Sequence, residues 1–396
     1  MKINKIVILC GYDFPQGMAA TTRILSYCKG FYENDIDVEI FSYAWRCNDS
    51  MNPEKGEIDG IKYFYSHSWK KSSSWLYKNI VDRFLIVTET IKKILLSNKK
   101  RKIDYLFLSF DDVGRMLEFV PLLRLLGVRM VFIHDEFPEP MRNKLVSSIP
   151  WWKKTIFRLI FTFISGKVLM TYPLKDFYDK ISPSPTFIFP SIIDINRFGG
   201  ILDPVSRERE NYICYTGALE FTSDNIDYII HAFSVASKIY PDLELRLYGA
   251  PSEENETKVL KILQNEKCQK RVRLMGRVAH DEIPNILSKA KIVLTSQPNN
   301  VRTKGGFATK IGEYLASGTP TLVSDVGDVS RYFTHSVELY MVPPGDKVLY
   351  AQELVYMLLH YNEALHVAVS GQNKIFSEFN AKSMTAKLIR FLGTLA

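Results

Sequence analysis

The sequence predicts an α/β protein built from two doubly wound domains that face each other across a cleft. The chain has 396 residues, more than a single hydrophobic core usually serves, so two domains of somewhat under 200 residues are expected. In each half, short β-branched runs alternate with helical patterns, which favours parallel sheets covered by helices. Open parallel sheets bind ligands beyond the carboxyl ends of their strands, so we expect the site in the cleft.

The first half begins with an apolar run that ends at Gly11, which predicts a buried strand. Strand and helix patterns then alternate up to residue 171. The expected strands are 5–10, 38–43, 105–109, 128–134 and 168–171, and the expected helices are about 19–33, 112–126 and one that starts at 151.

The second half repeats this alternation after a proline-rich and turn-rich stretch at 182–204. We expect domains at 1–195 and 196–375, and a C-terminal helix at 376–396 that can cross back to the first domain. The expected strands are 212–215, 243–248, 272–275, 292–295 and 320–323, and the expected helices are 225–240, 256–264, 282–290 and about 309–316.

The composition is that of a globular protein, with 46% hydrophobic and 24% charged residues, which excludes a disordered or collagen-like chain. The apolar start is too short for a signal peptide, and no run of 18 uninterrupted apolar residues predicts a membrane span. Five cysteines without CxxC spacing exclude a disulfide framework and a structural zinc site, so we expect a cytoplasmic protein; they are Cys10, Cys28, Cys47, Cys214 and Cys268.

The net charge of +8 lies entirely in the first half of the chain. Residues 69–102 alone carry ten basic side chains against two acidic ones, and a second stretch, 150–167, has basic residues and no acid. Both stretches have apolar side chains at helical spacing: Leu76, Ile80, Phe84, Val87, Ile91 and Leu95 in the first, and Trp151, Trp152, Ile156, Phe157, Leu159, Ile160, Phe161 and Phe163 in the second.

Aromatic rings beside lysines suit the headgroups of anionic lipids, because rings lie at the interface while ammonium groups meet phosphate. The two stretches therefore predict a protein bound peripherally to the inner face of a membrane. The alternative, that both stripes face the core and the lysines are only solvated, stays open. Nucleic acid is not expected as a partner, because no nucleic-acid-binding motif accompanies the basic charge.

The sequence predicts a basic, glycine-rich loop at 299–308 that leads into the predicted helix at 309–316. Backbone N–H groups and the positive end of a helix dipole favour a diphosphate, and Lys310 adds charge there. Glu313, one turn later, is placed to accept hydrogen bonds from sugar hydroxyls. Gly318 and Pro320 end the helix.

The stretch from Gly305 to Pro320, GGFATKIGEYLASGTP, resembles the pattern EGFGxPxxEAxAxGxP of retaining B-type glycosyltransferases of family 4 (group 1), and the likeness extends over nearly the whole chain. The resemblance implies the GT-B architecture of two Rossmann-like domains, with the acceptor bound by 1–195 and the nucleotide sugar by 196–375. It also implies Glu313 as the ligand of the ribose, and Phe307 and Thr309 are assigned to the same nucleotide-sugar site.

Three further segments carry the resemblance. The stretch GYDFPQGMAATTR (11–23) resembles the glycine loop after the family's first strand, with Gly17 near the donor phosphate and the acceptor. The stretch PSIIDINRF (190–198) resembles the signature at the domain boundary. In the second domain, Gly217 follows the order of the family's glycine turns, and Arg277 and Val278 are implied to hold the nucleotide base.

The sequence departs from the family pattern at two charged positions. Gly305 stands where the family has its first acid, and Ala218 stands where it has an arginine that neutralises the donor diphosphate. We expect Arg302, Lys304 and Lys310 to supply the missing charge, with both lysines acting on the leaving diphosphate. The alternative is that activity has been lost.

His134, at the end of the strand 128–134, is the remaining candidate, because family members often have a histidine near this place that faces the donor sugar. The alternative is a histidine that caps the strand and pairs with Asp135. No HxH or HxxxH pair and no DxD loop is present, and Asp111-Asp112 is interpreted as the cap of the following helix, so neither a metal nor another cofactor is expected.

The sequence thus predicts a metal-independent, retaining transferase of a hexosyl or N-acetylhexosaminyl group, acting on a glycan or lipid-linked acceptor in cell-surface polysaccharide synthesis. Two other interpretations stay open. One is a catalytically degenerate partner subunit of the same fold. The other is a nucleotide-sugar epimerase, which would need two close acids and a histidine.

Overall fold

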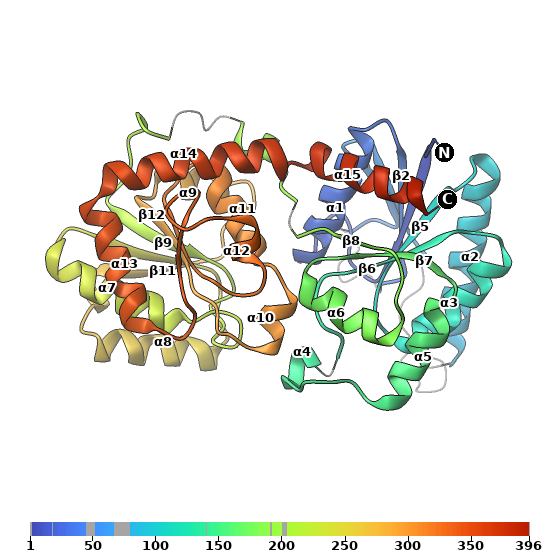
Figure 1. Cartoon of the computed structure of the whole chain (residues 1–396), viewed down its shortest axis with the longest axis horizontal. Coiled ribbons are helices and arrows are strands. Elements are labelled where there is room, and N and C mark those ends of the chain that lie inside the picture. Colours follow the sequence, from blue (N-terminus) through green and yellow to red (C-terminus); the bar gives the residue numbers. More distant parts are fainter. Residues whose placement is uncertain are drawn as a thin grey trace. The chain divides into compact units, whose positions relative to one another are not determined.

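The computed structural model describes residues 2–17, 19–44, 52–66, 80–139, 141–190, 192–199 and 204–395. The chain forms two compact units, one of residues 1–192 and 381–396 and the other of residues 193–380 (Figure 1). Of the residues used above, Cys47, Trp69, Lys70, Lys71, Leu76, Lys78 and Ser191 lie outside the described residues.

The first unit contains an eight-stranded sheet in the order β3-β4-β2-β1-β5-β6-β7-β8. All pairs are parallel except β3 with β4, an antiparallel hairpin that the sequence patterns did not predict. The strands are β1 (Lys5–Cys10), β2 (Asp37–Ser42), β3 (Lys55–Ile58), β4 (Ile61–Tyr65), β5 (Tyr105–Ser109), β6 (Met130–His134), β7 (Ile164–Leu169) and β8 (Thr186–Ile188).

Helices cover both faces of this sheet (Figure 1). Helices α1 (Ala19–Tyr32) and α15 (Ala381–Thr394) pack on the face to which Ile6 and Ile8 point. Gly30 allows this contact, since a Cβ there would lie 2.4 Å from the carbonyl oxygen of Ala381. The chain also forms α2 (Asp82–Lys100), α3 (Val113–Leu125), α4 (Met141–Lys144), α5 (Trp151–Phe161) and α6 (Tyr172–Ile181), with α2 against α3, α3 against α5 and α5 against α6.

The second unit contains a six-stranded, wholly parallel sheet in the order β11-β10-β9-β12-β13-β14. The strands are β9 (Tyr212–Thr216), β10 (Glu244–Tyr248), β11 (Val272–Gly276), β12 (Ile292–Thr295), β13 (Thr321–Ser324) and β14 (Tyr340–Val342).

One face of this sheet packs against α7 (Ile226–Ile239), α8 (Glu253–Asn265) and α13 (Lys347–Leu359) in a single hydrophobic core. Helices α9 (Ile283–Lys289) and α11 (Thr309–Ala316) lie against the other face, where they contact Tyr212 and Thr216. The unit is completed by α10 (Val301–Gly305), α12 (Val329–Tyr332), α14 (Tyr361–Glu378) and the short 3-10 helices η2 (Ile195–Phe198) and η3 (Gln269–Arg271).

Each unit is therefore a doubly wound α/β domain, which confirms the two doubly wound domains of the predicted fold class. The predicted strands 5–10, 105–109 and 292–295 and the predicted helix 309–316 coincide with β1, β5, β12 and α11. The prediction that 299–308 is wholly a loop was wrong: Asn300 accepts a hydrogen bond from the Thr303 N–H and begins α10. No helix among the described residues is long and apolar enough to cross a membrane.

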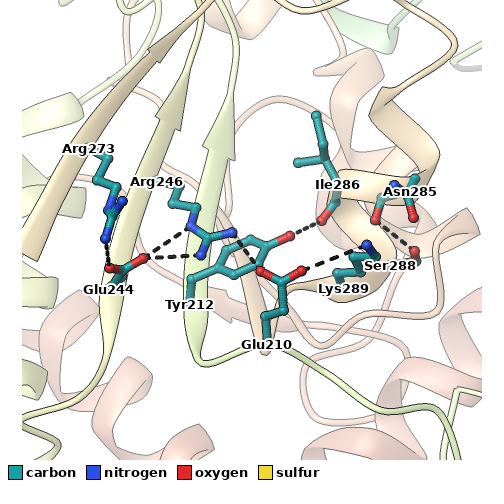
Figure 2. Close-up of polar contacts among 9 residues, drawn as sticks. All are labelled: Glu210, Tyr212, Glu244, Arg246, Arg273, Asn285, Ile286, Ser288 and Lys289. Atoms are coloured by element: carbon teal, nitrogen blue, oxygen red, sulfur yellow. Dashed lines mark hydrogen bonds and ion pairs between the residues drawn. The ribbon is translucent and has the colours of Figure 1, made fainter.

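Charged side chains contact one another across the sheet of the second unit near the beginnings of β9, β10 and β11 (Figure 2). This charged ladder consists of Glu210, Glu244, Arg246 and Arg273. The Arg246 guanidinium lies 3.9 Å from the centre of the Tyr212 ring and contacts Glu210 at 2.8 Å and Glu244 at 3.1 Å. Arg273 pairs with the other oxygen of Glu244. Stacking and two charge-assisted contacts hold Arg246 in one position, so this cluster joins neighbouring strands.

Arg246→Ala is expected to lower the free energy of unfolding by about 1–2 kcal/mol, because it removes a stacked ring contact and two ion pairs whose worth is reduced by partial exposure. Urea denaturation measures the change. Lys258→Ala, which breaks the exposed Lys258–Glu254 pair, is the control and should leave the curve unchanged. Equal midpoints for Arg246→Ala and wild type would contradict a stabilising role of the ladder.

Candidate functional site

Three glycine turns meet where β9, β10 and β11 end. The Gly217 N–H donates to the Tyr248 carbonyl at 2.9 Å, and the Gly249 N–H donates to the Gly276 carbonyl at 2.8 Å. A Cβ on Gly249 would overlap the carbonyl oxygen of Gly217, and Gly276 has a φ of +72°, so both positions favour glycine. The three turns form an edge of half-buried backbone, called the glycine edge below, at the carboxyl ends of the strands, where α/β sheets bind ligands.

Lys310 extends from the first turn of α11 to this glycine edge. Its Nζ lies 2.7 Å from Asp224 Oδ1 and 3.0 Å from the Tyr215 hydroxyl, and it lies over the Tyr215 ring. A Cβ on Gly217 would come within 2.7 Å of the same Nζ. The structure thus brings Lys310 to the turn that carries Ala218, and it adds Asp224, which the sequence analysis did not single out.

The N-terminus of α11 adds backbone donors next to Lys310. Its N-cap residue is Ala308, whose methyl group cannot accept a hydrogen bond, so no side chain of that residue caps the helix. The first-turn N–H groups of a helix carry partial positive charge and bind anions. Thr309, the first residue of α11, is exposed.

Arg302 and Lys304 lie on α10 and differ in their surroundings. Arg302 pairs with Glu220 at 3.5 Å, which links α10 to the loop after Gly217. Lys304 is exposed and has no hydrogen bond or ion pair among the residues that the structure describes. Because Glu220 and Asp224 offset Arg302 and Lys310, Lys304 supplies the uncompensated positive charge of this group.

Glu313, on α11, contacts two side chains that the sequence analysis did not assign to the site. Its Oε1 accepts a hydrogen bond from Arg197 Nη1 at 2.6 Å and lies 3.7 Å from His280 Nε2. Arg197 belongs to the boundary signature, and His280 was not singled out in the sequence. His280 follows the implied base-binding residues: Arg277 is exposed and Val278 is half-buried.

Phe307 is a core residue rather than an exposed one. Its ring is 5% exposed and packs against the rings of Tyr332 and Phe333. It therefore holds the α10–α11 connection in place. Only its backbone, or the small exposed part of the ring, is open to a ligand.

In the first unit, Gly17 lies in the loop after β1, and His134 is the last residue of β6, at the carboxyl edge of the sheet. A Cβ on Gly17 would come within 2.8 Å of the Asp13 carbonyl oxygen, so the loop there needs glycine. His134 is buried, and its Nε2 lies 3.4 Å from Asp111 Oδ2. Burial raises the pKa of the Asp111 carboxyl, but its contact with His134 and the positive charge of Arg142 lower that pKa to about 2.

The alternative pairing of His134 with Asp135 was wrong. Asp135 instead contacts Arg23 Nε at 3.1 Å, and Arg23 is buried on α1. Asp112 caps α3, since its side chain accepts the Arg115 N–H at 2.8 Å, as predicted. Within the described ranges, no three histidine, cysteine or acidic side chains gather in a group that could hold a metal ion.

Comparison with known proteins gives a family match for the second unit. Residues 210–360 match the family described as "Glycosyl transferases group 1". Over 137 residues, 34% of this chain, the sequence is 26% identical to the "UDP-N-acetylglucosamine--peptide N-acetylglucosaminyltransferase GtfA subunit" of Streptococcus agalactiae. Over 172 residues, 40% of this chain, it is 26% identical to the mannosylfructose-phosphate synthase of Agrobacterium fabrum. These matches cover only 25% and 37% of the two relatives.

Solved structures match over the full length of the chain. Sucrose-phosphate synthase from Thermosynechococcus elongatus aligns with a TM-score of 0.71 at 14% identity, covering 99% of this chain and 100% of the other. Anabaena HepE, in complex with UDP and glucose, aligns with a TM-score of 0.69 at 12% identity and the same coverage. At such identities the likeness shows the fold alone. The chain therefore has a GT-B-like fold, and its residues 210–360 match the group 1 glycosyltransferase family in sequence.

Proposed function

We propose that this protein transfers a sugar from a nucleoside diphosphate donor, which binds at the glycine edge of the second unit. One observation carries the proposal: the Gly217 turn, the Lys310 ammonium and the uncapped N-terminus of α11 converge within the segment that matches the family. Backbone N–H groups and a cation in one place are what a diphosphate requires. Glu313, one turn further along α11, would accept the ribose hydroxyls.

The charges suit a reaction in which the diphosphate leaves. As the glycosidic bond breaks, negative charge builds up on the diphosphate, and fixed donors already aimed at it lower the barrier. Lys310, Lys304 and the N–H groups of α11 are these donors in our proposal, with Arg302 alongside. They replace the arginine that the family has at the position of Ala218, and no metal ion is required.

The finer assignments rest on the family pattern and on the names of the relatives. We propose retention at the anomeric carbon and a hexosyl or N-acetylhexosaminyl donor, since the relatives are named for N-acetylglucosamine and mannose chemistry. The acceptor in our proposal is a glycan or a lipid-linked sugar, used in cell-surface polysaccharide synthesis and bound by the first unit near Gly17 and His134.

Nucleotide binding and donor cleavage test the proposal together. Calorimetric titration with UDP, GDP and ADP should show micromolar to millimolar binding of one of them, and a matching nucleotide sugar should release that diphosphate when an acceptor is added. Binding without release would identify the catalytically degenerate partner subunit. No binding to any nucleoside diphosphate would refute the assignment of the site.

We further propose that α3 and α5 of the first unit form a face for an anionic membrane. These adjacent helices expose Leu125 (83%), Trp151 (78%) and Leu159 (61%), while Phe157 and Phe161 face the core. Helix α5 carries Lys153, Lys154 and Arg158 and no acid. The predicted apolar stripe of residues 76–95 lies partly on α2. Among its members that the structure describes, only Val87 is buried, and Ile80 and Phe84 are exposed. Exposed rings beside lysines support lipid contact over the alternative of an entirely buried stripe.

Vesicles containing anionic lipid should therefore sediment the protein, and neutral vesicles should not. Each lysine near the surface adds about 1 kcal/mol and is screened within roughly 8 Å, so binding should fall steeply as salt rises. The double change Lys153→Glu with Lys154→Glu should abolish sedimentation. The same reversal at Lys258 and Lys261, on the exposed side of α8, is the control and should have no effect. Equal binding to both kinds of vesicle would contradict the proposal.

A further inference from the structure

We propose that Arg197 is a positioning residue for the nucleoside end of the donor. It fixes the Glu313 carboxylate relative to the loop that follows β11. The inference rests on the proposed function, because it assumes that Glu313 and this loop bind the ribose and the base.

Arg197 joins two segments that are far apart in the sequence. Its Nη1 donates to Glu313 Oε1 at 2.6 Å, and its Nη2 donates to the His280 carbonyl oxygen at 2.7 Å. The planar guanidinium holds both acceptors in a fixed fork geometry, whereas the donors of a lysine ammonium rotate and share one nitrogen. One side chain therefore links α11 to the 276–280 loop.

The backbone that carries Arg197 is itself anchored. Asp194 caps η2 by accepting the Asn196 N–H at 3.1 Å, and the Ile193 N–H donates to the Phe379 carbonyl at 3.1 Å. The Phe198 ring next to it is fully buried. Because the backbone at Arg197 is anchored, its side chain has less freedom to move. The contact is therefore more ordered than an ion pair between two free surface side chains.

The contact leaves Glu313 able to bind hydroxyls. Arg197 uses only Oε1, because its second nitrogen points to the His280 carbonyl, and Oε2 has no hydrogen bond within the described part of the chain. The carboxylate held in this way keeps Oε2 free in a fixed position for a ribose hydroxyl. We therefore infer that Arg197 positions Glu313 for the ribose. An arginine that competed with the ribose for Glu313 would bind both carboxylate oxygens.

His280 does not replace Arg197 as the cation at this carboxylate. Its Nε2 lies 3.7 Å from Glu313 Oε1, and burial together with the Arg197 charge lowers the pKa of His280 below its usual value. Both causes favour the neutral imidazole over the charged one. A pocket of about 410 Å³, within the range of small-molecule sites, opens beside this group and is lined by Arg197, His280, Asp281 and Pro284.

Calorimetry of full-length variants with UDP and UMP tests the inference. If a nucleotide with another base binds more tightly, its diphosphate and monophosphate are used instead. Arg197→Ala should weaken both ligands about tenfold and to the same degree, because Arg197 acts at the nucleoside end. Lys310→Met should weaken the diphosphate more than the monophosphate. Arg197→Lys should recover little of the loss, since an ammonium lacks the rigid fork whose two nitrogens meet the two acceptors.

Two controls separate positioning from general destabilisation. Arg246→Ala removes an arginine of similar exposure that also joins two acceptors, but at the opposite ends of the strands, and it should bind UDP as wild type does. In a double-mutant cycle, Arg197→Ala should add almost nothing in a Glu313→Ala background, because it acts through Glu313.

Unchanged or tighter UDP binding by Arg197→Ala would overturn the inference, and so would an equal loss in Arg246→Ala. Full additivity with Glu313→Ala would also overturn it. If wild type itself binds no nucleoside diphosphate, the proposed function fails rather than this inference alone.

Discussion

Replacing Glu313 by alanine is expected to weaken nucleoside diphosphate binding by one to two orders of magnitude. A hydrogen bond to a charged group contributes about 1.5–3 kcal/mol, and the carboxylate would accept ribose hydroxyls that alanine cannot bind. Glu313 lies one turn into α11, next to the uncapped N-terminus that would hold the diphosphate. Calorimetric titration with the tightest diphosphate measures the loss.

The removal of Glu313 also leaves Arg197 without its acid, so a second variant is needed. Glu313→Gln keeps the shape and one acceptor oxygen, and it should retain an intermediate affinity. Glu338→Ala, which breaks the Lys374 ion pair elsewhere in the same unit, is the matched control and should bind normally. Wild-type affinity in Glu313→Ala would remove this residue from the site.

Replacing Lys310 is expected to lower turnover about a hundredfold or more, and to lower donor affinity by less. Charge on the leaving diphosphate is greatest in the transition state, so a cation beside it contributes most there. The Nζ of Lys310 lies at the Gly217 turn, where the family pattern has its arginine next in sequence. Steady-state rates of diphosphate release separate kcat from KM.

Lys310→Met alone would leave the buried Asp224 without its cation, which itself destabilises the protein. The double variant Lys310→Met with Asp224→Asn removes both charges. Turnover should remain low in this variant while the melting temperature recovers. Recovery of turnover would show that Lys310 acts only by pairing with Asp224.

Lys304 offers a cleaner comparison, because it has no ion pair within the described ranges. Lys304→Ala should reduce kcat without a change in stability. Wild-type rates in both lysine variants would contradict the compensation for Ala218 and favour the catalytically degenerate subunit.

Several elements could be predicted from the sequence because the forces that form them are local. The apolar runs of β1, β5 and β12 and the periodicity of α11 coincide with the observed bounds. Helix α10 has only five residues, too few for a periodic pattern, and it depends on the cap at Asn300. The β3–β4 hairpin is short and is stabilised by pairing with β2, which local patterns do not reveal.

The alternation of strands and helices, the glycine turns and the segment that carries Lys310 and Glu313 can all be recognised from local patterns of residues. Which side chains meet depends on how the chain packs in three dimensions. Lys310 and Asp224 are 86 residues apart in sequence, and Arg197 and Glu313 are 116 residues apart. Neither pair leaves a periodic trace, because an ion pair between distant segments depends on strand order and helix packing. The apolar and basic pattern of residues 150–167 could likewise be recognised from the sequence. Which of its rings face solvent and which face the core depends on the packing of α5 against α3.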